Sequence, residues 1–127
     1  MIDHVSITVR DLGTAQKFYD SVMAALDFPC VYRTDRAIGY GVRDRPASKD
    51  PYISIFQSDR VVADHRHWAF RAKSRSAVDR FHAAALAAGG HDDGAPGLRQ
   101  DYHADYYAAF VRDPDGNRIE AVCHIPV

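Results

Sequence analysis

Two histidines and one glutamate in this chain have the residue types and the placement of a metal site. His4 and His67 each open a β-prone segment, and Glu120 lies within another, between Ile119 and Ala121. Two imidazoles and a carboxylate that arrive from separate strands can hold a divalent first-row metal and leave positions open for substrate or water. We therefore predict that His4, His67 and Glu120 are metal ligands.

The same local pattern occurs twice in the chain, and this repetition pairs the two histidines. Phe18 follows His4 by fourteen residues (18 − 4), and Phe81 follows His67 by the same interval (81 − 67). Each histidine thus opens a strand that is followed by a helix containing the phenylalanine. The repeat predicts two equivalent units, each of which can present a ligand from its first and last strands.

The three candidate ligands also have alternative interpretations. A buried carboxylate without a partner is costly, so Glu120 needs either a cation or an ion pair. The arginines available for such a pair are Arg71, Arg112 and Arg118. In addition, His65 and His67 form an H-x-H pair on one face of a strand, which is an alternative chelate. The repeat favours the metal site of His4, His67 and Glu120 over both alternatives.

Periodicity predicts the elements that position these residues in the first unit. Residues 2–10 alternate between apolar and polar, as in a half-buried strand, and the polar face carries His4, Ser6 and Thr8. Apolar residues at helical spacing over 15–26 predict an amphipathic helix that ends before Pro29. Three short strands are expected near 30–34, 37–43 and 52–57.

The second unit repeats this order after a linker at about 58–64. A strand is expected over 65–72, a helix that starts at the capping segment 76–79, and a stop at Gly89-Gly90. Residues 92–104 contain two glycines and a proline and are predicted to form a mobile or substrate-covering loop. A strand over 106–112, a turn over 113–117 and a strand over 118–125 complete the unit. We expect one domain over 1–127, with unit one at about 1–60 and unit two at about 65–127.

Composition restricts the classes of partner. The 127 residues are 46% hydrophobic and 26% charged, as in an ordinary globular protein, and the 16 basic residues nearly balance the 17 acidic ones. This balance predicts neither nucleic-acid nor membrane binding and favours a small-molecule substrate. The start lacks a signal-like apolar stretch, so the two cysteines are expected to stay reduced and the protein to be cytoplasmic.

Three segments resemble the vicinal oxygen chelate superfamily, which includes glyoxalase I, extradiol dioxygenases, fosfomycin-resistance thiol transferases and bleomycin-binding proteins. They are Asp3-His4-Val5, His67-Trp68-Ala69-Phe70 and the segment from Asp113 to Glu120. The resemblance extends over essentially the whole chain. It implies an α+β fold of two βαβββ units that form an incomplete barrel around a metal or ligand cavity, with the helices outside, and a homodimer. It also implies a divalent metal ion (Zn, Ni, Mn, Fe or Co) held by His4, His67 and Glu120.

Glyoxalase I has a fourth protein ligand on the strand that ends its first unit, usually glutamate or glutamine. The internal offset of sixty-three residues (67 − 4) places Gln57 at this position (120 − 63), whereas the usual apolar-acid-apolar pattern aligns Ser54 there. Neither residue supplies a carboxylate base, and here the sequence departs from the glyoxalases.

Other polar side chains are expected to complete the cavity. The catalytic candidates besides the metal ligands are Gln57, Arg71 and Tyr107, and Arg71 is suited to hold an anionic substrate. The substrate-binding candidates are Ser6, Thr8, Arg99, Tyr102 and His103.

The resemblance and the candidate ligands together predict a metal-dependent, glyoxalase-like enzyme. The metal would stabilise an enolate or oxyanion of a small oxygen-bearing substrate by Lewis acidity, in a lyase or isomerase reaction. Two alternatives stay open: an extradiol-type dioxygenase, and a non-catalytic protein that binds a small molecule or an antibiotic.

Overall fold

The computed structural model describes residues 1–43 and 47–127, and these residues form two βαβββ units. Unit one contains β1 (His4–Val9), α1 (Leu12–Ala25), β2 (Cys30–Arg33), β3 (Ala37–Gly41) and β4 (Tyr52–Gln57). Unit two contains β5 (His67–Arg71), α2 (Arg75–Ala87), β6 (His91–Leu98), β7 (Tyr107–Arg112) and β8 (Arg118–Cys123). The predicted α+β class and the division into two units are confirmed.

Each unit builds its own four-stranded sheet. The strand orders are β1-β4-β3-β2 and β5-β8-β7-β6, so β1 and β5 are edge strands of their sheets. In both sheets the first strand runs parallel to the last, and the other neighbours are antiparallel. Within the described chain the two sheets stay separate rather than closing a barrel.

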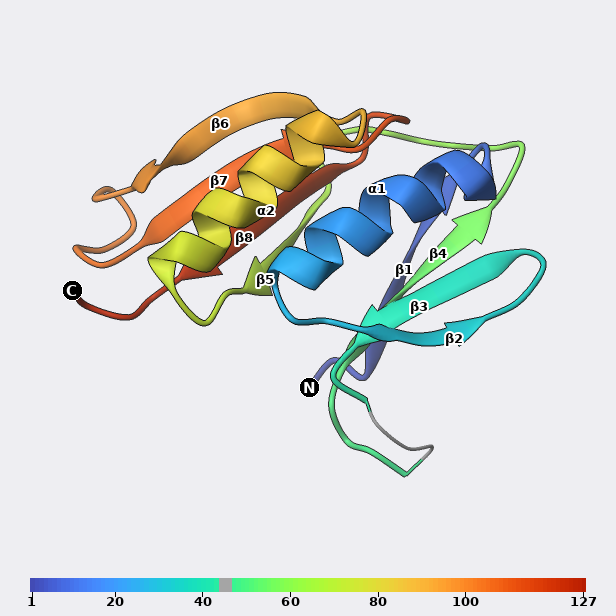
Figure 1. The fold of residues 1–127 in the computed structure, drawn as a ribbon, viewed down its shortest axis with the longest axis horizontal. Coiled ribbons are helices and arrows are strands. Elements are labelled where there is room, and N and C mark those ends of the chain that lie inside the picture. Colours follow the sequence, from blue (N-terminus) through green and yellow to red (C-terminus); the bar gives the residue numbers. More distant parts are fainter. Residues whose placement is uncertain (44–46) are drawn as a thin grey trace.

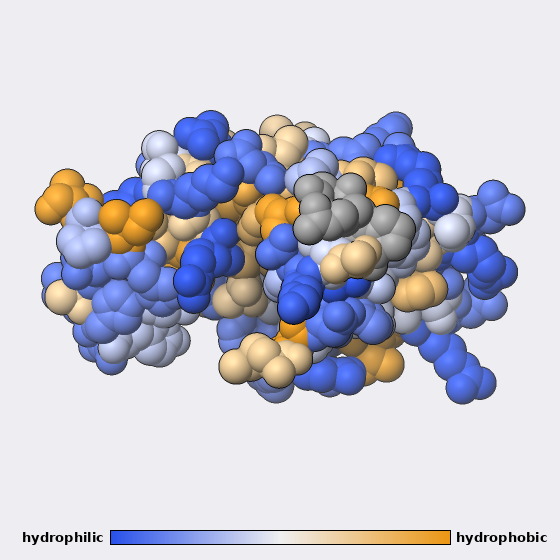
Figure 2. Space-filling model, turned by 90° about the horizontal axis from the view of Figure 1, so that it is seen from below, coloured by the Kyte–Doolittle hydropathy of each residue, from blue (hydrophilic) through white to orange (hydrophobic). Residues whose placement is uncertain are grey.

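Both helices lie on the same side of the sheets and pack against each other (Figure 1). The core lies between these helices and the sheet faces that they cover. We call the opposite side of each sheet, turned away from the helices, its outer face. Seen from below, much of the surface is hydrophilic, and apolar side chains gather between the left and right parts of the molecule (Figure 2).

Local sequence accounts for both helices. Asp11 caps α1 by accepting a hydrogen bond from the Thr14 amide at 2.8 Å, and Phe18 is among the residues that α1 buries. Ser74 caps α2 by accepting from the Ala77 amide at 3.1 Å. The cap therefore lies two residues before the predicted one at Ser76, because Ser74 takes the extended backbone that a cap requires. None of the helices in the described residues has the length and apolar character of a membrane-crossing segment.

The prediction of a loop over 92–104 was wrong for most of that segment. Residues His91–Leu98 form β6, an edge strand that pairs with β7 through two register shifts, one on each side of Gly94. Gly94 has a φ of 152°, a conformation that other residues rarely adopt. Glycine and proline are tolerated on edge strands and at bulges. The same residues that suggested a loop therefore mark an irregular edge strand.

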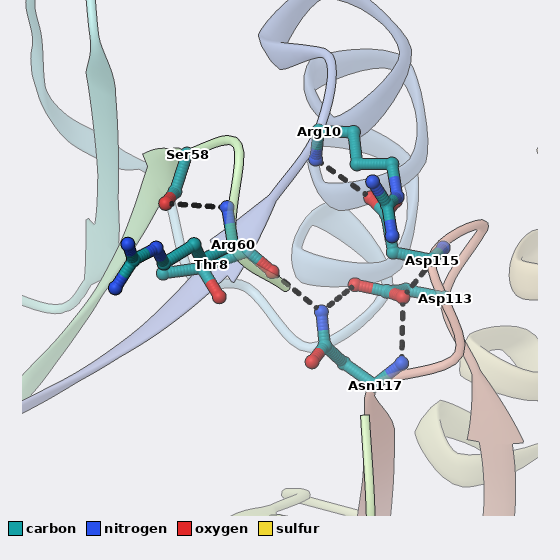
Figure 3. Close-up of polar contacts among 7 residues, drawn as sticks. All are labelled: Thr8, Arg10, Ser58, Arg60, Asp113, Asp115 and Asn117. Carbon is teal, nitrogen blue, oxygen red and sulfur yellow. Dashed lines mark hydrogen bonds and ion pairs between the residues drawn. The ribbon is translucent and has the colours of Figure 1, made fainter. Parts of the chain in front are cut away.

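A buried carboxylate connects the two units. Asp113, with no exposed surface, follows β7 and accepts hydrogen bonds from the Tyr19 hydroxyl on α1 at 2.7 Å and from the Asn117 side chain at 2.9 Å. Its other oxygen accepts from the backbone amides of Asp115 and Asn117. The Asn117 amide group also donates to the Thr8 carbonyl on β1 at 2.9 Å (Figure 3). We call these contacts of Asp113, Asn117, Tyr19 and Thr8 the inter-unit clasp.

Burial determines the titration of the clasp. Loss of water around the Asp113 carboxyl raises its pKa above the usual value, and the hydrogen bonds from Asn117 and Tyr19 oppose this change in part. Burial also raises the pKa of the Tyr19 hydroxyl, as does the neighbouring Asp113. The Tyr19 hydroxyl is thus a hydrogen-bond donor at all physiological pH values.

Replacing Tyr19 with phenylalanine is expected to lower the free energy of unfolding by about 1–3 kcal/mol, because a buried acceptor loses its donor while the ring is retained. Urea denaturation measures this change. Tyr102→Phe, at a side chain that is 66% exposed, is the matched control and should change stability by less than about 0.5 kcal/mol. Equal stabilities of the two variants would show that the clasp does not hold the units together.

Candidate functional site

The outer face of the second sheet brings together a glutamate, a histidine and a tyrosine. Glu120 on β8 pairs in register with Ala69 of β5 and with Phe110 of β7, so it lies in the interior of the sheet. Its side chain is only 2% exposed. One carboxylate oxygen, Oε2, lies 3.3 Å from Nε2 of His67, and the other accepts a hydrogen bond from the Tyr106 hydroxyl.

The structure also shows whether an arginine pairs with Glu120, which was the alternative to a metal. Arg112 and Arg118 both pair with Asp93, at 3.1 and 3.4 Å. Arg71 lies within 4.0 Å of no carboxylate in the described part of the chain. The neighbours of the buried Glu120 carboxylate are therefore His67 and Tyr106, rather than a guanidinium group.

Tyr106 is the site residue that sequence reasoning missed in this role. Desolvation is the main cause that raises the pKa of its hydroxyl, and the hydrogen bond to Glu120 raises it further, so the hydroxyl remains a donor. Its ring also packs against the rings of Tyr102, His103 and His124, with centroids 4.8 to 5.4 Å away. The available signal was strand periodicity, because Tyr106 lies beside Tyr107 on the predicted strand, and neighbours on a strand point to opposite faces.

Two histidines continue this cluster. Nε2 of His103 lies 2.8 Å from Nδ1 of His124, and Nδ1 of His103 accepts from the Asp105 amide at 3.0 Å. The backbone amide needs a lone pair on Nδ1, so the proton of neutral His103 is on Nε2 and is donated to His124. His103 therefore lies beside Tyr106, and its hydrogen-bonding positions are occupied.

His4 lies on the other sheet, at the start of β1. Its Nδ1 is 2.9 Å from a carboxylate oxygen of Asp3, and its ring stacks on Tyr52 with centroids 5.0 Å apart. The other Asp3 oxygen accepts from Arg43 at 3.0 Å. The hydrogen bonds from His4 and Arg43 lower the pKa of the Asp3 carboxyl. A carboxylate that holds one imidazole nitrogen as a donor leaves the other nitrogen unprotonated, as in many metal-binding histidines.

Strand register distinguishes the two candidates for the fourth position. In unit two, His67 pairs with Arg118, and Glu120 lies two residues further along β8. In unit one, His4 pairs with Tyr52, and the residue two positions further is Ser54. Ser54 is thus the counterpart of Glu120. Gln57 lies at the end of β4, where its side-chain oxygen accepts from the Leu12 amide at 3.0 Å and so supports the start of α1.

Ser54 also has a tyrosine partner. Its side chain is 3% exposed, and its hydroxyl oxygen accepts from the Tyr32 hydroxyl at 2.5 Å. Gly39 provides the room for this contact, since a Cβ there would lie 2.2 Å from Cε1 of the Tyr32 ring. Each sheet thus places a buried polar side chain and a tyrosine hydroxyl together on its outer face.

Three of the predicted substrate-binding residues line two separate cavities. Ser6 and Thr8 line a cavity of about 260 Å³ together with Trp68, Arg118 and the linker between the units. Arg99 lines another, of about 360 Å³, that also contains His65 and His67. Its guanidinium donates to the Ala95 carbonyl at 2.7 Å and lies over the Phe110 ring. Arg99 is thus close to His67, whereas Ser6 and Thr8 lie beside the linker between the units.

Two candidate residues lie apart from Glu120. The Tyr107 hydroxyl donates to Asp79 of α2 at 2.6 Å, so this side chain lies on the helix side of the sheet. Arg71 lines a cavity between the two units instead of the one beside His67. Tyr102 is exposed, and its ring packs against that of Tyr106.

The described residues of one chain bring together two of the three predicted metal ligands. His67 and Glu120 are adjacent, but no group of three histidine, cysteine or acidic side chains in the described ranges could hold a metal ion. His4 has its own partners on the first sheet. Within a single chain the donor set therefore remains incomplete without His4.

Comparison with known proteins gives one consistent result. The family model of the glyoxalase/bleomycin resistance protein/dioxygenase superfamily matches residues 1–121. A glyoxalase/bleomycin resistance protein from Albidiferax ferrireducens T118 has 31% identity and a TM-score of 0.80, and 99% of each chain is covered. No curated protein matches.

Two further structures are similar in fold. A glyoxalase/bleomycin resistance protein/dioxygenase family enzyme from Burkholderia phytofirmans PsJN has 20% identity and a TM-score of 0.72, covering 97% of this chain and 98% of that one. The fosfomycin resistance protein FosX from Mesorhizobium loti has 19% identity and a TM-score of 0.68, with coverages of 97% and 91%.

Gly39→Ala is expected to lower the free energy of unfolding by about 1–3 kcal/mol, since the new methyl group must displace the Tyr32 ring. Thermal or urea denaturation measures this change. The added substitution Tyr32→Ala should remove most of the penalty that Gly39→Ala causes, in a double-mutant cycle. Gly13→Ala in α1, where a Cβ meets only a side-chain oxygen at 3.6 Å, is the control and should be neutral or stabilising. A Gly39→Ala variant as stable as this control would show that Tyr32 does not pack over β3.

Proposed function

Because the chain belongs to the glyoxalase/bleomycin resistance protein/dioxygenase superfamily, we propose that it is a metal-dependent, glyoxalase-like enzyme. It acts on a small oxygen-bearing substrate in a lyase or isomerase reaction. The observation that carries this proposal is the near-complete burial of the Glu120 carboxylate against His67. A carboxylate and an imidazole that lie this close to each other can bind the same divalent cation.

The third ligand, His4, is supplied by a second copy of the chain in a homodimer. Two facts support this. One chain on its own does not bring a third ligand to His67 and Glu120 within its described residues, and His4 already has the carboxylate partner that favours a metal-binding tautomer. In a symmetric dimer, His4 of each protomer would meet His67 and Glu120 of the other, which gives two equivalent sites.

Each protein group has a defined role in this site. A divalent ion held by the three ligands supplies Lewis acidity toward vicinal oxygens of the substrate. Tyr106 holds the Glu120 carboxylate by its hydrogen bond, and Asp3 holds His4. Arg99, in the cavity beside His67, is suited to bind an anionic part of the substrate.

The residue at the fourth position, Ser54, limits which reactions the site can catalyse. Ser54 accepts a hydrogen bond from Tyr32, so its own hydroxyl proton can be donated to a substrate oxygen. It cannot act as the carboxylate base that glyoxalase I-type proton abstraction requires. These properties support a reaction in which the site stabilises charge that develops on an oxygen.

The donor set also suits an extradiol-type dioxygenase, which is the alternative function. Two histidines and one carboxylate are the ligands that non-haem iron oxygenases use, with open positions for substrate and oxygen. Both functions are consistent with a cytoplasmic protein, because Cys30 and Cys123 are free thiols and a reducing compartment preserves them.

Elemental analysis of untagged protein, purified without added metal, separates these functions. About one zinc or nickel ion per chain is the expected result and supports the lyase or isomerase reaction. Iron or manganese would support the dioxygenase. Protein that stays metal-free after reconstitution would contradict both and support a binding protein without catalysis.

Single substitutions test the ligands. His4→Ala and Glu120→Ala should each lower the bound metal at least about tenfold, because each removes one of three protein ligands. His91→Ala, at an exposed histidine on β6, is the matched control and should leave metal binding unchanged. Metal contents equal to that of the parent chain would exclude the proposed ligand set.

Mixed dimers test whether the site is shared. A purified heterodimer of a His4→Ala chain and a Glu120→Ala chain should bind about half the metal of the parent dimer, since one of its two shared sites keeps all three ligands. If each site belonged to a single chain, both sites of the heterodimer would be defective and metal binding would not recover. Size-exclusion chromatography with light scattering establishes the dimer first.

A further inference from the structure

A second binding environment lies between the two units, beside the edge strands β1 and β5. It is a cavity of about 700 Å³. Its walls include Val5 and Ile53 from unit one and Trp68 and Phe70 from unit two, and Phe28, which follows α1, also lines it. Neither His67 nor Glu120 lines it. The cavity therefore does not contain the His67–Glu120 pair, although Tyr52, on which His4 stacks, is part of its lining.

The cavity has the size and lining of a small-molecule site. Ligand cavities usually measure about 300–1,000 Å³, and they combine apolar walls with a few polar groups. The aromatic rings of Phe28 and Phe70 meet edge to face across the units, with centroids 6.4 Å apart. The apolar area between the two halves of the molecule is visible from below (Figure 2). Its aromatic walls favour a flat, aromatic ligand.

The cavity lining also includes charged residues. Arg71 lines it and, within the described residues, has no carboxylate in ion-pair range. Asp50 also lines the cavity and accepts a hydrogen bond from the Ser48 hydroxyl at 3.2 Å. The guanidinium of such an arginine is a planar fork of donors that matches a carboxylate or sulfonate.

We propose that this cavity binds a small aromatic anion, with its ring between Trp68, Phe70 and Val5 and its acidic group on Arg71. Binding at this place uses Arg71 and the aromatic walls rather than a metal, because none of the three predicted ligands His4, His67 and Glu120 lines the cavity. The chain would then carry an aromatic-acid site in addition to the proposed metal site.

The test uses the full chain in EDTA and the fluorescent anion 8-anilinonaphthalene-1-sulfonate. Trp68 is the single tryptophan of the chain, so saturable binding should both quench its emission and enhance that of the probe. Ile2→Glu places a negative charge at a lining residue that is 63% exposed, and Arg71→Gln removes the proposed anchor. Each should weaken binding about tenfold.

Matched controls separate this site from other apolar surfaces. Ile125→Glu changes an isoleucine that is 54% exposed outside the cavity, and Arg80→Gln changes an exposed arginine on α2. Both should bind the probe as the parent does. Asp50→Asn should leave binding unchanged or strengthen it. The proposal is overturned if the probe does not bind, if Ile2→Glu and Arg71→Gln bind like their controls, or if only Asp50→Asn weakens binding.

Discussion

The burial of Asp113 is the constraint on which the relation of the two units depends. A carboxylate without exposed surface is tolerated only if its lone pairs are satisfied, and here four hydrogen bonds satisfy them. One comes from α1 of the other unit, and Asn117 links the same cluster to the edge of β1. Because these donors come from both units, the clasp fixes how unit one is placed against unit two.

This placement explains why the outer faces stay open. With α1 and α2 packed against each other, the helix-covered faces of both sheets are buried together. The faces that carry His4 and Glu120 then have no helix over them. A buried carboxylate and an imidazole on an uncovered sheet face are typical of a site completed by another molecule, whether a metal, a substrate or a second protomer. The fold thus provides the surface, and the residues on it decide the chemistry.

The two units share one design but differ in the polar residue at its centre. Each outer face holds a buried polar side chain with a tyrosine hydroxyl donating to it: Tyr106 to Glu120 in unit two, Tyr32 to Ser54 in unit one. Glutamate can bind a cation, whereas the serine hydroxyl is a weaker ligand and a better hydrogen-bond partner. The duplication therefore places a carboxylate at the centre of one outer face and a hydroxyl at the centre of the other.

The sequence by itself determined most of the elements, the two units and the equivalent positions of His4 and His67 in them, because strand and helix periodicity and the spacing of Phe18 and Phe81 are local properties. Tertiary structure decided what depends on distant partners. Strand register, which follows from pairing between β1 and β4, made Ser54 and not Gln57 the counterpart of Glu120. Pairing with β7 turned an expected loop into β6. The turn after β7 could be predicted from its sequence. Its role in the inter-unit clasp could not, because that role depends on Tyr19 and Thr8, which lie about a hundred residues away in the chain and reach the turn only in the folded protein.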